Sequence, residues 1–492
     1  MISRWNLIKL FIISFVLTSI TNFPSGFTNS SVNTAVRELR SFINESYYRR
    51  GYDFNTATQD LIYSAILNCW FVVQVLGSMI APFITDKYGR KFAYLVSTTI
   101  MTAGSALQFL ATFIHSPELL MLGRLSAGLM SPLSDAALIL YLQETSPVQF
   151  RGSFSFLGEI GYCFMCLLGM VLGMRSVLGD SLRNLLGFSI LPGVVAVFFL
   201  FFMPETPKFL MISRRNRIKA LASLRFFQGD KKENDRILDD FMREGTLDEH
   251  KKRSSIREVL STWHLRFAVF LACAVLVLTL SFYPILQSST RFFEHIEIES
   301  ELAEFSSTGL MVAFTLACMF GSLFIDRYPR RYLVLISGAL ATFFLTLFIV
   351  FSGISHLHWK LKYFALGALF LYAITFGMVL GPVSWFVAPE LVSQRHRSTL
   401  FCLCYGINNV LIAITNFATS SLYSSFGALV MGPLLVVPSI ISLVIIYLYL
   451  PETLGKETHE IVRAIRYRRK HTSNDDSRSS SDSEEGQNNA MI

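Results

Sequence analysis

The hexapeptide Asp86-Lys87-Tyr88-Gly89-Arg90-Lys91 separates two long apolar stretches, residues 60–84 and 92–114. A near copy, Asp326-Arg327-Tyr328-Pro329-Arg330-Arg331, separates residues 305–325 from residues 332–353. Each copy is a short charged turn between stretches that are long enough to cross ~30 Å of hydrocarbon, which takes about 20 apolar residues in a helix. The recurrence predicts that the chain contains two related groups of membrane helices.

Two more short patterns recur in the same order along the chain. One is an acid followed seven residues later by an arginine, and the other is a Pro-Glu-Thr tripeptide. The occurrences are Glu144 with Arg151, Pro204-Glu205-Thr206, Glu390 with Arg397, and Pro451-Glu452-Thr453. Three recurring patterns in one order indicate duplicated six-helix halves, the architecture of transporters whose site lies between repeats near the middle of the membrane.

The composition excludes several classes of protein. Hydrophobic residues make up 52% of the 492 residues and charged residues 16%, against roughly 25% charged residues in soluble proteins. The mean hydropathy is +0.46, and a soluble protein could not bury so much apolar surface. All seven cysteines lie in apolar stretches, so a secreted disulfide scaffold is not expected. The net charge of +8 needs no nucleic acid, because basic residues gather on the cytoplasmic side of membranes.

The apolar stretches predict an all-α polytopic membrane protein with twelve transmembrane helices in two six-helix, pseudo-symmetric bundles. The predicted spans are residues 7–28, 60–84, 92–114, 118–142, 153–174, 183–203, 267–290, 305–325, 332–353, 363–388, 398–420 and 427–450. The N-terminal bundle then covers residues 1–203 and the C-terminal bundle residues 267–450. Residues 204–266 form a cytoplasmic linker with short amphipathic helices, and residues 451–492 form a largely disordered cytoplasmic tail.

The basic residues predict the orientation of the chain. The segment Glu205–Arg266 holds 15 Lys and Arg residues and the segment Pro451–Ile492 holds seven more, which places the linker and both termini in the cytoplasm. The first outer loop then contains Asn44-Glu45-Ser46, an N-glycosylation sequon with Asn44 as the acceptor. We expect a multi-pass protein of the plasma membrane.

Taken together, the motifs resemble the sugar-porter branch of the major facilitator superfamily, the glucose-transporter-like solute carrier 2 family. The resemblance covers nearly the whole chain and rests on Asp86–Lys91, Gly123-Arg124, Glu144 with Arg151-Gly152, Pro204–Lys208, Asp326–Arg331, Gly381-Pro382 with Trp385, Pro389-Glu390-Leu391 and Pro451–Thr453. It implies a transporter that works by alternating access. It also implies a cytoplasmic gate, which in this sequence is Glu144, Arg151, Lys208, Asp326, Arg330, Glu390 and Arg397.

The substrate wall departs from the pattern of that family. Span five of sugar porters carries a glutamine that binds the sugar, and counting from Arg151-Gly152 places Glu159 there. Span seven lacks both glutamines and the asparagine of the family's run and reads Val277–Tyr283 instead. A hydroxyl left without a partner costs roughly 1–3 kcal/mol, so these losses weaken the case for a hexose. The candidate substrate-binding residues are Glu159, Tyr283, Gln287, Trp385, Asn408 and Asn409.

Among the charged residues of the predicted spans, Arg124, Asp135 and Glu159 lie away from the span ends, where charge is costly and marks candidate functional residues. Either acid could bind a cationic substrate, carry a coupled proton, or act as a protonated hydrogen-bonding group in the structure. Arg124 either pairs with an acid on a neighbouring helix or only caps the extracellular end of the inner charged cluster. The acid that couples protons in part of the family is missing from Gly26-Phe27-Thr28-Asn29, which favours facilitated diffusion.

We therefore expect a membrane transporter of a small polar solute, with a sugar or polyol favoured by the family resemblance. One alternative is a proton-coupled carrier, or a carrier of organic cations or other metabolites, that uses Glu159. Another alternative is a non-transporting sensor of the same fold. No nucleotide-binding loop, metal cluster or catalytic triad is recognisable, so neither enzymatic activity nor a cofactor is expected. The expected partners are the solute and the lipid bilayer, and no nucleic acid.

Overall fold

The computed structural model describes residues 4–147, 151–230, 233–249, 256–321, 328–392 and 394–453, and within these residues the chain forms helices and turns without a β-strand. Eleven helical segments in this part of the chain are long and apolar enough to cross a membrane. A twelfth apolar helix, Leu157–Gly173, is shorter. The predicted all-α fold with twelve membrane helices is confirmed. The predicted tail lies outside the described residues from position 454 onward.

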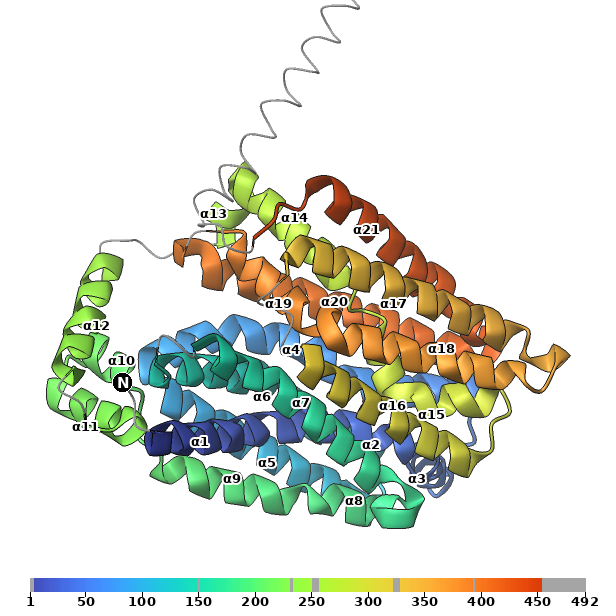
Figure 1. The fold of residues 1–492 in the computed structure, drawn as a ribbon. Helices are drawn as coiled ribbons and strands as arrows, with labels where there is room; N and C mark the ends of the chain where they lie inside the picture. Colours follow the sequence, from blue (N-terminus) through green and yellow to red (C-terminus); the bar gives the residue numbers. More distant parts are fainter. Residues whose placement is uncertain are drawn as a thin grey trace, which may run out of the picture.

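The first six membrane segments form one bundle, blue to green in Figure 1. The first segment consists of α1 (Arg4–Asn22), the π-helical turn η1 (Phe23–Phe27) and α2 (Thr28–Thr34). The others are α4 (Thr56–Tyr88), α5 (Arg90–Ile114), α6 (Pro117–Thr145), α7 (Arg151–Gly173), and α8 (Leu182–Phe188) with α9 (Ile190–Phe202). Two short elements, α3 (Val36–Tyr48) and η3 (Arg175–Gly179), join segments at one end of the bundle.

The last six segments form the second bundle, yellow to red in Figure 1. They begin with α14 (Trp263–Val277) and α15 (Phe282–His295), which together make the seventh segment. The others are α16 (Ser300–Gly321), α17 (Arg330–Gly353), α18 (Leu361–Thr375) with η5 (Phe376–Leu380) and α19 (Gly381–Glu390), α20 (Gln394–Phe426), and η6 (Gly427–Val430) with η7 (Gly432–Val436) and α21 (Val437–Tyr449). A 3-10 turn, η4 (Ser355–Leu357), joins α17 to α18.

Four short helices connect the bundles: α10 (Pro207–Ile212), α11 (Arg217–Gln228), α12 (Asn234–Glu249) and α13 (Ile256–Ser261). The helices α10 and α11 pack against α6, whereas α13 packs against α14 and α20. Apolar residues of α10–α12, including Leu224 and Leu238, form a small buried cluster of their own. We call the end of the bundles at which this linker lies the linker end, and the opposite end, which carries α3, the α3 end (Figure 1).

Capping residues set where two helices begin at the α3 end. The Asn55 side chain accepts a hydrogen bond of 2.9 Å from Thr58 N at the start of α4. The Ser116 hydroxyl accepts one of 3.3 Å from Leu119 N at the start of α6, and Pro117 follows as the first helical residue. Both arrangements satisfy a backbone N–H that has no partner within its helix. The lengths of these spans therefore follow from local sequence as well as from hydropathy.

The bundles meet where several membrane helices are interrupted. They contact along the helix pairs α4 and α20, α7 and α16, and α2 and α15. The first segment carries the π turn η1 with Pro24 and Gly26, and the tenth carries η5 just before Gly381-Pro382. The seventh is broken at residues 278–281, between α14 and α15. Interrupted helices typically line the binding sites of transporters, because they expose polar groups near the middle of the membrane.

Candidate functional site

Tyr283 lies where the two bundles meet. It is the second residue of α15, immediately after the break in the seventh membrane segment. Its ring contacts the ring of Phe71 on α4 edge to face, with centroids 5.5 Å apart. Because α4 belongs to the N-terminal bundle, the candidate binding residue Tyr283 faces the interface between the bundles.

The two acids of the membrane segments lie near this tyrosine. The carboxyl groups of Asp135 on α6 and Glu159 on α7 are each close enough to the Tyr283 hydroxyl to interact with it electrostatically. Asp135 forms a hydrogen bond with Ser131, one turn earlier on α6. Glu159 has neither a hydrogen bond nor an ion pair with another residue of the described part of the chain. Both acids are partly exposed, so neither is sealed in the packed core of its bundle.

Trp385 provides an aromatic side of the candidate site, and Asn408 and Asn409 provide side-chain amides. The Trp385 ring on α19 lies 5.6 Å from the ring of Tyr405 on α20. Asn408 is 2% exposed and Asn409 is 3% exposed. Among the described residues, neither polar atom of the Asn408 side chain has a hydrogen-bond partner, and Asn409 Nδ2 has none either. These amides are buried polar groups with unused hydrogen-bonding capacity.

Gln287 is committed to a partner in the protein. Its Oε1 accepts a hydrogen bond of 2.6 Å from Asn416 Nδ2, which ties α15 to α20. Its Nε2 is buried and has no partner in the part of the chain that the structure describes. Gln287 lies one helical turn from Tyr283 toward the α3 end, so the structure brings Tyr283 and Glu159 together and places Gln287 at the edge of the site.

Arg124 acts as a buried crosslink rather than as half of an acid–base pair. It is 2% exposed on α6. Its Nη2 donates to Asn29 Oδ1 at 3.0 Å and to Leu67 O at 3.4 Å, and its Nη1 donates to Thr28 O at 3.4 Å. The partners are an amide and carbonyl oxygens, and they lie toward the α3 end. Among the described residues these contacts pair Arg124 with no acid, and its expected cap of the extracellular end of the inner charged cluster stays a prediction.

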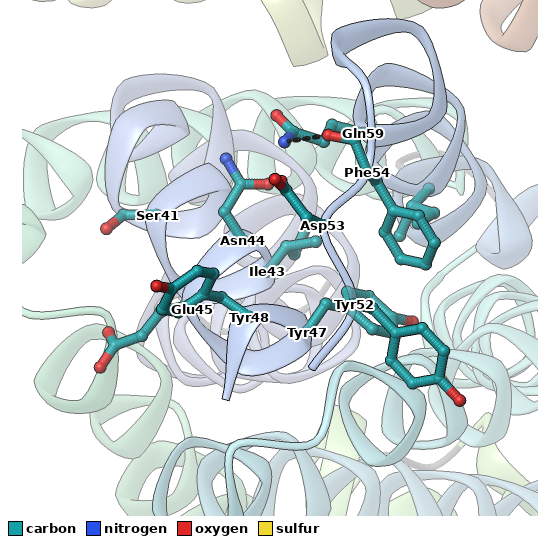
Figure 2. A pocket seen from close by; sticks show the side chains of 11 residues that line it. Ser41, Ile43, Asn44, Glu45, Tyr47, Tyr48, Tyr52, Asp53, Phe54 and Gln59 are labelled. Atoms are coloured by element: carbon teal, nitrogen blue, oxygen red, sulfur yellow. Dashed lines mark hydrogen bonds between the residues drawn. The ribbon is translucent and has the colours of Figure 1, made fainter. Parts of the chain in front are cut away.

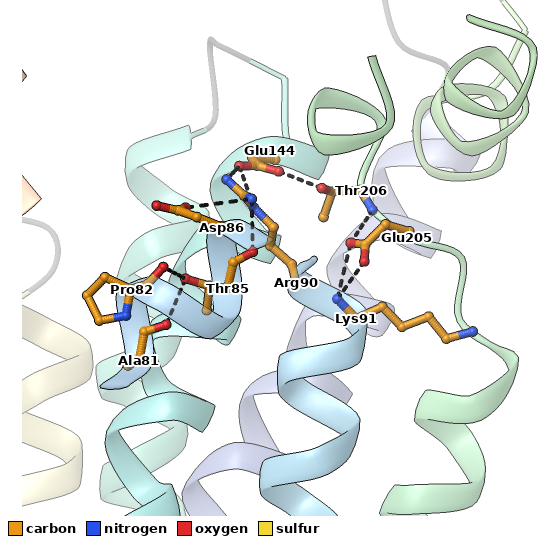
Figure 3. A network of polar contacts seen from close by, with 9 residues as sticks. All are labelled: Ala81, Pro82, Thr85, Asp86, Arg90, Lys91, Glu144, Glu205 and Thr206. Carbon is orange, nitrogen blue, oxygen red and sulfur yellow. Dashed lines mark hydrogen bonds and ion pairs between the residues drawn. The ribbon is translucent and has the colours of Figure 1, made fainter. Parts of the chain in front are cut away.

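A charged network joins α5, α6 and the segment that follows α9 at the linker end of the N-terminal bundle (Figure 3). Arg90 at the start of α5 donates from Nε to Glu144 Oε1 at 3.0 Å, and its Nη2 lies 2.8 Å from the same oxygen. Glu144 is at the end of α6, and its other oxygen accepts a hydrogen bond of 2.5 Å from the Thr206 hydroxyl. The network fixes the ends of α5 and α6 relative to the chain that follows α9.

Glu205 caps the start of α5 from outside that helix. Its carboxylate accepts hydrogen bonds from Lys91 N at 3.0 Å and from Thr206 N at 2.8 Å (Figure 3). A carboxylate is favourable there, because the first N–H groups of a helix lack partners and carry partial positive charge. Burial raises the pKa of the Glu205 carboxyl above its usual value, while these hydrogen bonds and the nearby charge of Arg90 oppose the rise.

The C-terminal bundle repeats this network. Arg330 at the start of α17 forms an ion pair with Glu390 at the end of α19. Glu452 accepts hydrogen bonds from Arg330 N at 2.8 Å, Arg331 N at 3.1 Å and Thr453 N at 3.0 Å. Two contacts thus recur in both halves: the ion pair of an arginine with an acid, and the bonds of a Pro-Glu-Thr carboxylate to backbone N–H groups. The carboxylate of each Pro-Glu-Thr tripeptide caps a helix that begins after a charged turn.

Three members of the predicted gate cannot be placed by their side chains. Asp326 lies outside the described residues, and the side chains of Arg151 and Arg397 do too, although the backbone of both is helical. Lys208 is partly buried on α10. The prediction omitted Arg90, which is the partner of Glu144. The sequence carried a signal for it, because Arg90 occupies the position in the first charged turn that Arg330 occupies in the second.

Polar contacts join the bundles at the α3 end. Asn33 on α2 donates to Ser289 Oγ at 2.7 Å and to Leu286 O at 3.0 Å, and it accepts from Thr290 N at 3.1 Å. Two ion pairs also connect the bundles there: Asp60 with Arg291 and Glu294 with Arg37. By contrast, the ion pairs Arg90–Glu144 and Arg330–Glu390 at the linker end each lie within one bundle.

The sequon residue Asn44 is exposed on α3. Figure 2 shows it at the edge of a surface depression of about 440 Å³, lined on other sides by tyrosines of α3 and of the following turn. The lining tyrosines are Tyr47, Tyr48 and Tyr52. This depression is at the α3 end of the molecule, and Tyr283 is not among the residues that line it.

Comparisons with known proteins agree with this architecture. The family described as "Sugar (and other) transporter" matches residues 11–464. Solute carrier family 2, facilitated glucose transporter member 3 of Ovis aries is 25% identical over 467 residues, which cover 91% of each chain. Solute carrier family 2, facilitated glucose transporter member 1 of Gallus gallus is 26% identical over 456 residues, which cover 90% of each chain.

Solved structures of a xylose transporter share the fold. The inward-open conformation of XylE from E. coli superposes with a TM-score of 0.72 at 16% identity, covering 92% of this chain and 99% of that one. The XylE proton:xylose symporter bound to 6-bromo-6-deoxy-D-glucose superposes with a TM-score of 0.69 at 15% identity, covering 92% and 98%. At such identities the likeness concerns the fold alone.

Proposed function

This chain belongs to the sugar transporter family, because the family match covers nearly its whole length, and on that premise we propose that it carries a hexose or a polyol by facilitated diffusion. It is a multi-pass membrane protein with the fold of the major facilitator superfamily, and its family is a class of transporters rather than of enzymes. The observation that carries the proposal is the family match over residues 11–464. Relatives named facilitated glucose transporters support a hexose.

Transport proceeds by alternating access, with the two bundles rocking about the site between them. The distribution of polar contacts supports this step. Contacts such as Asn33–Ser289 and Asp60–Arg291 join the bundles at the α3 end, so the structure represents a state closed at that end. Opening the α3 end requires these contacts to break while the linker ends approach one another.

The charged residues of the linker end form the gate on that side. Glu144 and Glu390 are held by Arg90 and Arg330 at equivalent places of the two bundles. Arg151 and Arg397 follow each acid at the same spacing in the sequence, with Lys208 and Asp326 in the adjoining segments. In the state open at the α3 end, we expect these groups to form ion pairs between the bundles.

The linker end faces the cytoplasm of the cell, and the protein resides in the plasma membrane. The concentration of Lys and Arg in the linker supports this orientation. The α3 end then faces outward, and its exposed Asn44 is accessible for N-glycosylation. Treatment with an amidase that removes N-glycans should change the electrophoretic mobility of the protein, and Asn44→Gln should abolish that change. The experiment tests whether the α3 end faces outward and whether Asn44 is glycosylated.

The substrate binds between the bundles at Glu159, Tyr283 and Trp385. Asn408 and Asn409 supply amides from α20, and Gln287 lies at the edge of the site. Aromatic rings stack on the apolar faces of sugar rings, and the amides bind hydroxyls. The unused hydrogen-bonding capacity of both asparagines supports their assignment.

Counterflow in liposomes containing the purified protein tests the proposed function. The liposomes are preloaded with unlabelled D-glucose or with a polyol, and the entry of the labelled form is followed. A facilitator produces transient, saturable accumulation without an ion gradient. Uptake that requires an inward proton gradient would make the protein a coupled carrier. Saturable binding without flux would make it a sensor of the same fold.

A further inference from the structure

The depression beside Asn44 combines aromatic rings with carboxylates and amides (Figure 2). Its volume of about 440 Å³ lies within the range of about 300–1,000 Å³ that is usual for sites of small molecules. Its wall consists of the end of α3, the turn that follows and the start of α4. Rings beside hydrogen-bonding groups suit a sugar, which has C–H faces as well as hydroxyls.

Asn44 is itself part of this wall. Its side chain is exposed, so a sugar joined to its Nδ2 begins at the depression. Ser41 comes three residues before it and Tyr48 four residues after it, which places both on the same face of α3, and both line the depression. A sugar on Asn44 therefore starts within reach of the lining side chains without any change of the fold.

Tyr48 offers a ring that is not engaged with another ring. The rings of Tyr52 and Phe54 stack with centroids 5.8 Å apart, and the ring of Tyr47 meets that of Phe54 edge to face at 5.3 Å. Tyr48 takes part in no ring contact of the described residues, and it is 74% exposed. An exposed aromatic face loses contact with water when it stacks on the C–H face of a sugar, which is favourable.

An acid stands near these rings on the turn that follows α3. Gln59 Nε2 donates to Phe54 O at 3.0 Å, which fixes this turn against the start of α4. Asp53 lies on the same turn, is exposed, and lines the depression. A carboxylate accepts hydrogen bonds from hydroxyl groups. The depression therefore presents a ring face and a hydrogen-bond acceptor to a neutral sugar.

We propose that the depression binds the first N-acetylglucosamine of an N-glycan on Asn44, with the sugar ring against Tyr48 and its hydroxyls toward Asp53. This site is separate from the proposed transport, and it rests on the proposed glycosylation of Asn44. The helix α3 also carries Arg37, which pairs with Glu294 of the C-terminal bundle at 2.9 Å. A sugar held between α3 and the following turn thus stabilises an element that closes the α3 end.

Cleavage by trypsin after Arg49 and Arg50 measures how firmly the end of α3 is held, because both arginines are exposed there. The protein is produced in cells that attach only high-mannose N-glycans. One part is treated with an endoglycosidase that leaves a single N-acetylglucosamine on the asparagine, and another part with an amidase that removes it. A ring contact or a hydrogen bond changes an opening equilibrium by about two- to tenfold. Cleavage should be faster by that factor after the amidase.

Variants assign the difference to the ring. Tyr48→Ala should abolish the difference between the two treated forms, whereas Tyr48→Phe, which keeps the ring, should retain it. Mere shielding of the cleavage sites by the sugar would leave the difference in place in Tyr48→Ala. Tyr332→Ala is the matched control, because Tyr332 is an exposed tyrosine on α17 at the linker end, and it should keep the full difference.

Asn44→Gln separates the sugar from a change of charge, because the amidase leaves a carboxylate at position 44. This variant has neither the sugar nor the new charge, and it should be cleaved as fast as the amidase-treated protein. Cleavage as slow as that of the form with one sugar would assign the difference to the charge and overturn the inference.

Further results would also overturn it. These are equal cleavage of the two treated forms of the wild type, a difference that persists in Tyr48→Ala, and a difference that is lost in Tyr48→Phe or in Tyr332→Ala. None of them touches the proposed transport or the glycosylation of Asn44. An electrophoretic mobility that the amidase leaves unchanged would overturn the proposed glycosylation and the inference with it.

Discussion

Arg291 Nη2 lies 3.2 Å from Asp60 Oδ2 and joins the C-terminal bundle to the N-terminal bundle at the α3 end. The other oxygen of Asp60 is paired with Arg40 Nη2 of α3 at 2.5 Å. Asp60 thus holds two arginines from different elements, and its side chain is only 7% exposed. Neither residue belongs to a recurring pattern of the sequence, so this contact is particular to one end of the molecule.

We predict that Asp60→Asn destabilises the α3-closed state by about 3 kcal/mol, because removing one partner leaves a buried arginine charge without compensation. The Arg291 side chain is only 12% exposed, so water compensates little of its charge. Thermal unfolding of the purified variant measures the loss. Labelling of a single cysteine at the α3 end should rise in parallel, because the bundles separate there more often.

The matched control is Glu45→Gln, which makes the same change of a carboxylate to an amide. Glu45 pairs with Arg49, and the two side chains are 50% and 55% exposed. An exposed pair is worth less than about 1 kcal/mol, so this variant should unfold at nearly the wild-type temperature. Equal unfolding temperatures for the two variants would contradict the assignment of Asp60 as a buried link.

Glu144→Gln should reduce transport, and Glu390→Gln should do so to a similar extent. Each change removes the charge that holds an arginine at the start of the next helix, Arg90 in one bundle and Arg330 in the other. A hydrogen bond to a charged group contributes about 1.5–3 kcal/mol, so the initial rate of counterflow should fall by about tenfold or more. Different behaviour of the two variants would argue against equivalent roles for the repeated networks.

Glu205→Ala should destabilise the N-terminal bundle by about 0.5–2 kcal/mol, because it removes the group that accepts from Lys91 N at the start of α5. Glu452→Ala removes the corresponding acceptor at the start of α17 and should have an effect of similar size. Thermal unfolding of both variants measures the two losses, with Glu233→Ala as a control, because Glu233 is an exposed acid of the linker. An unfolding temperature of Glu205→Ala equal to that of the control would show that the cap contributes nothing.

The raised pKa of Glu205 also predicts a dependence on pH. Burial makes this carboxyl bind its proton more tightly in the folded protein than in the unfolded chain. Its contribution to the free energy of unfolding therefore falls as pH rises from its usual pKa through the raised pKa. Glu205→Gln keeps an acceptor oxygen but cannot titrate, so unfolding of this variant should depend less on pH across that window. If the unfolding of Glu205→Gln depends on pH as strongly as that of the wild type, the pH dependence of the wild type comes from other groups.

Arg124→Lys should destabilise the protein by about 1–3 kcal/mol, although the charge is kept. An ammonium cannot reach Asn29, Thr28 and Leu67 with the geometry of a guanidinium, and these three acceptors tie α2 and α4 to α6. Arg50→Lys is the control, since Arg50 is exposed and pairs with the exposed Glu118. A smaller loss for Arg124→Lys than for its control would contradict the crosslinking role.

Hydropathy predicted the membrane helices because each is defined by its own local sequence. The span predicted at 92–114 is observed as α5 from Arg90 to Ile114, and the one at 332–353 as α17 from Arg330 to Gly353. The recurring patterns predicted equivalent charged sites in two halves, and the contacts of Glu205 and Glu452 are equivalent. Local composition and internal repetition were therefore sufficient for the fold.

The contacts between bundles could not be predicted in this way. Asp60 and Arg291 are separated by more than two hundred residues, and neither sequence context differs from that of an ordinary helix end. The placement of Asp135 and of Glu159 near Tyr283 depends on how three helices rotate in the assembled bundles, which periodicity does not determine. Arg90 was omitted from the predicted gate for another reason. Its role follows from that of Arg330 only when each position of the second charged turn is compared with the same position of the first.

Crosslinking at the α3 end tests alternating access most directly. Asn33 Nδ2 lies 2.7 Å from Ser289 Oγ across the two bundles, so cysteines introduced at both positions should form a disulfide in this state. In liposomes the account predicts that oxidation of Asn33→Cys/Ser289→Cys abolishes counterflow and that a reductant restores it. The same oxidation should leave the counterflow of each single variant unchanged. Counterflow that continues at full rate with the disulfide formed would show that the α3 end need not open, and it would contradict the account.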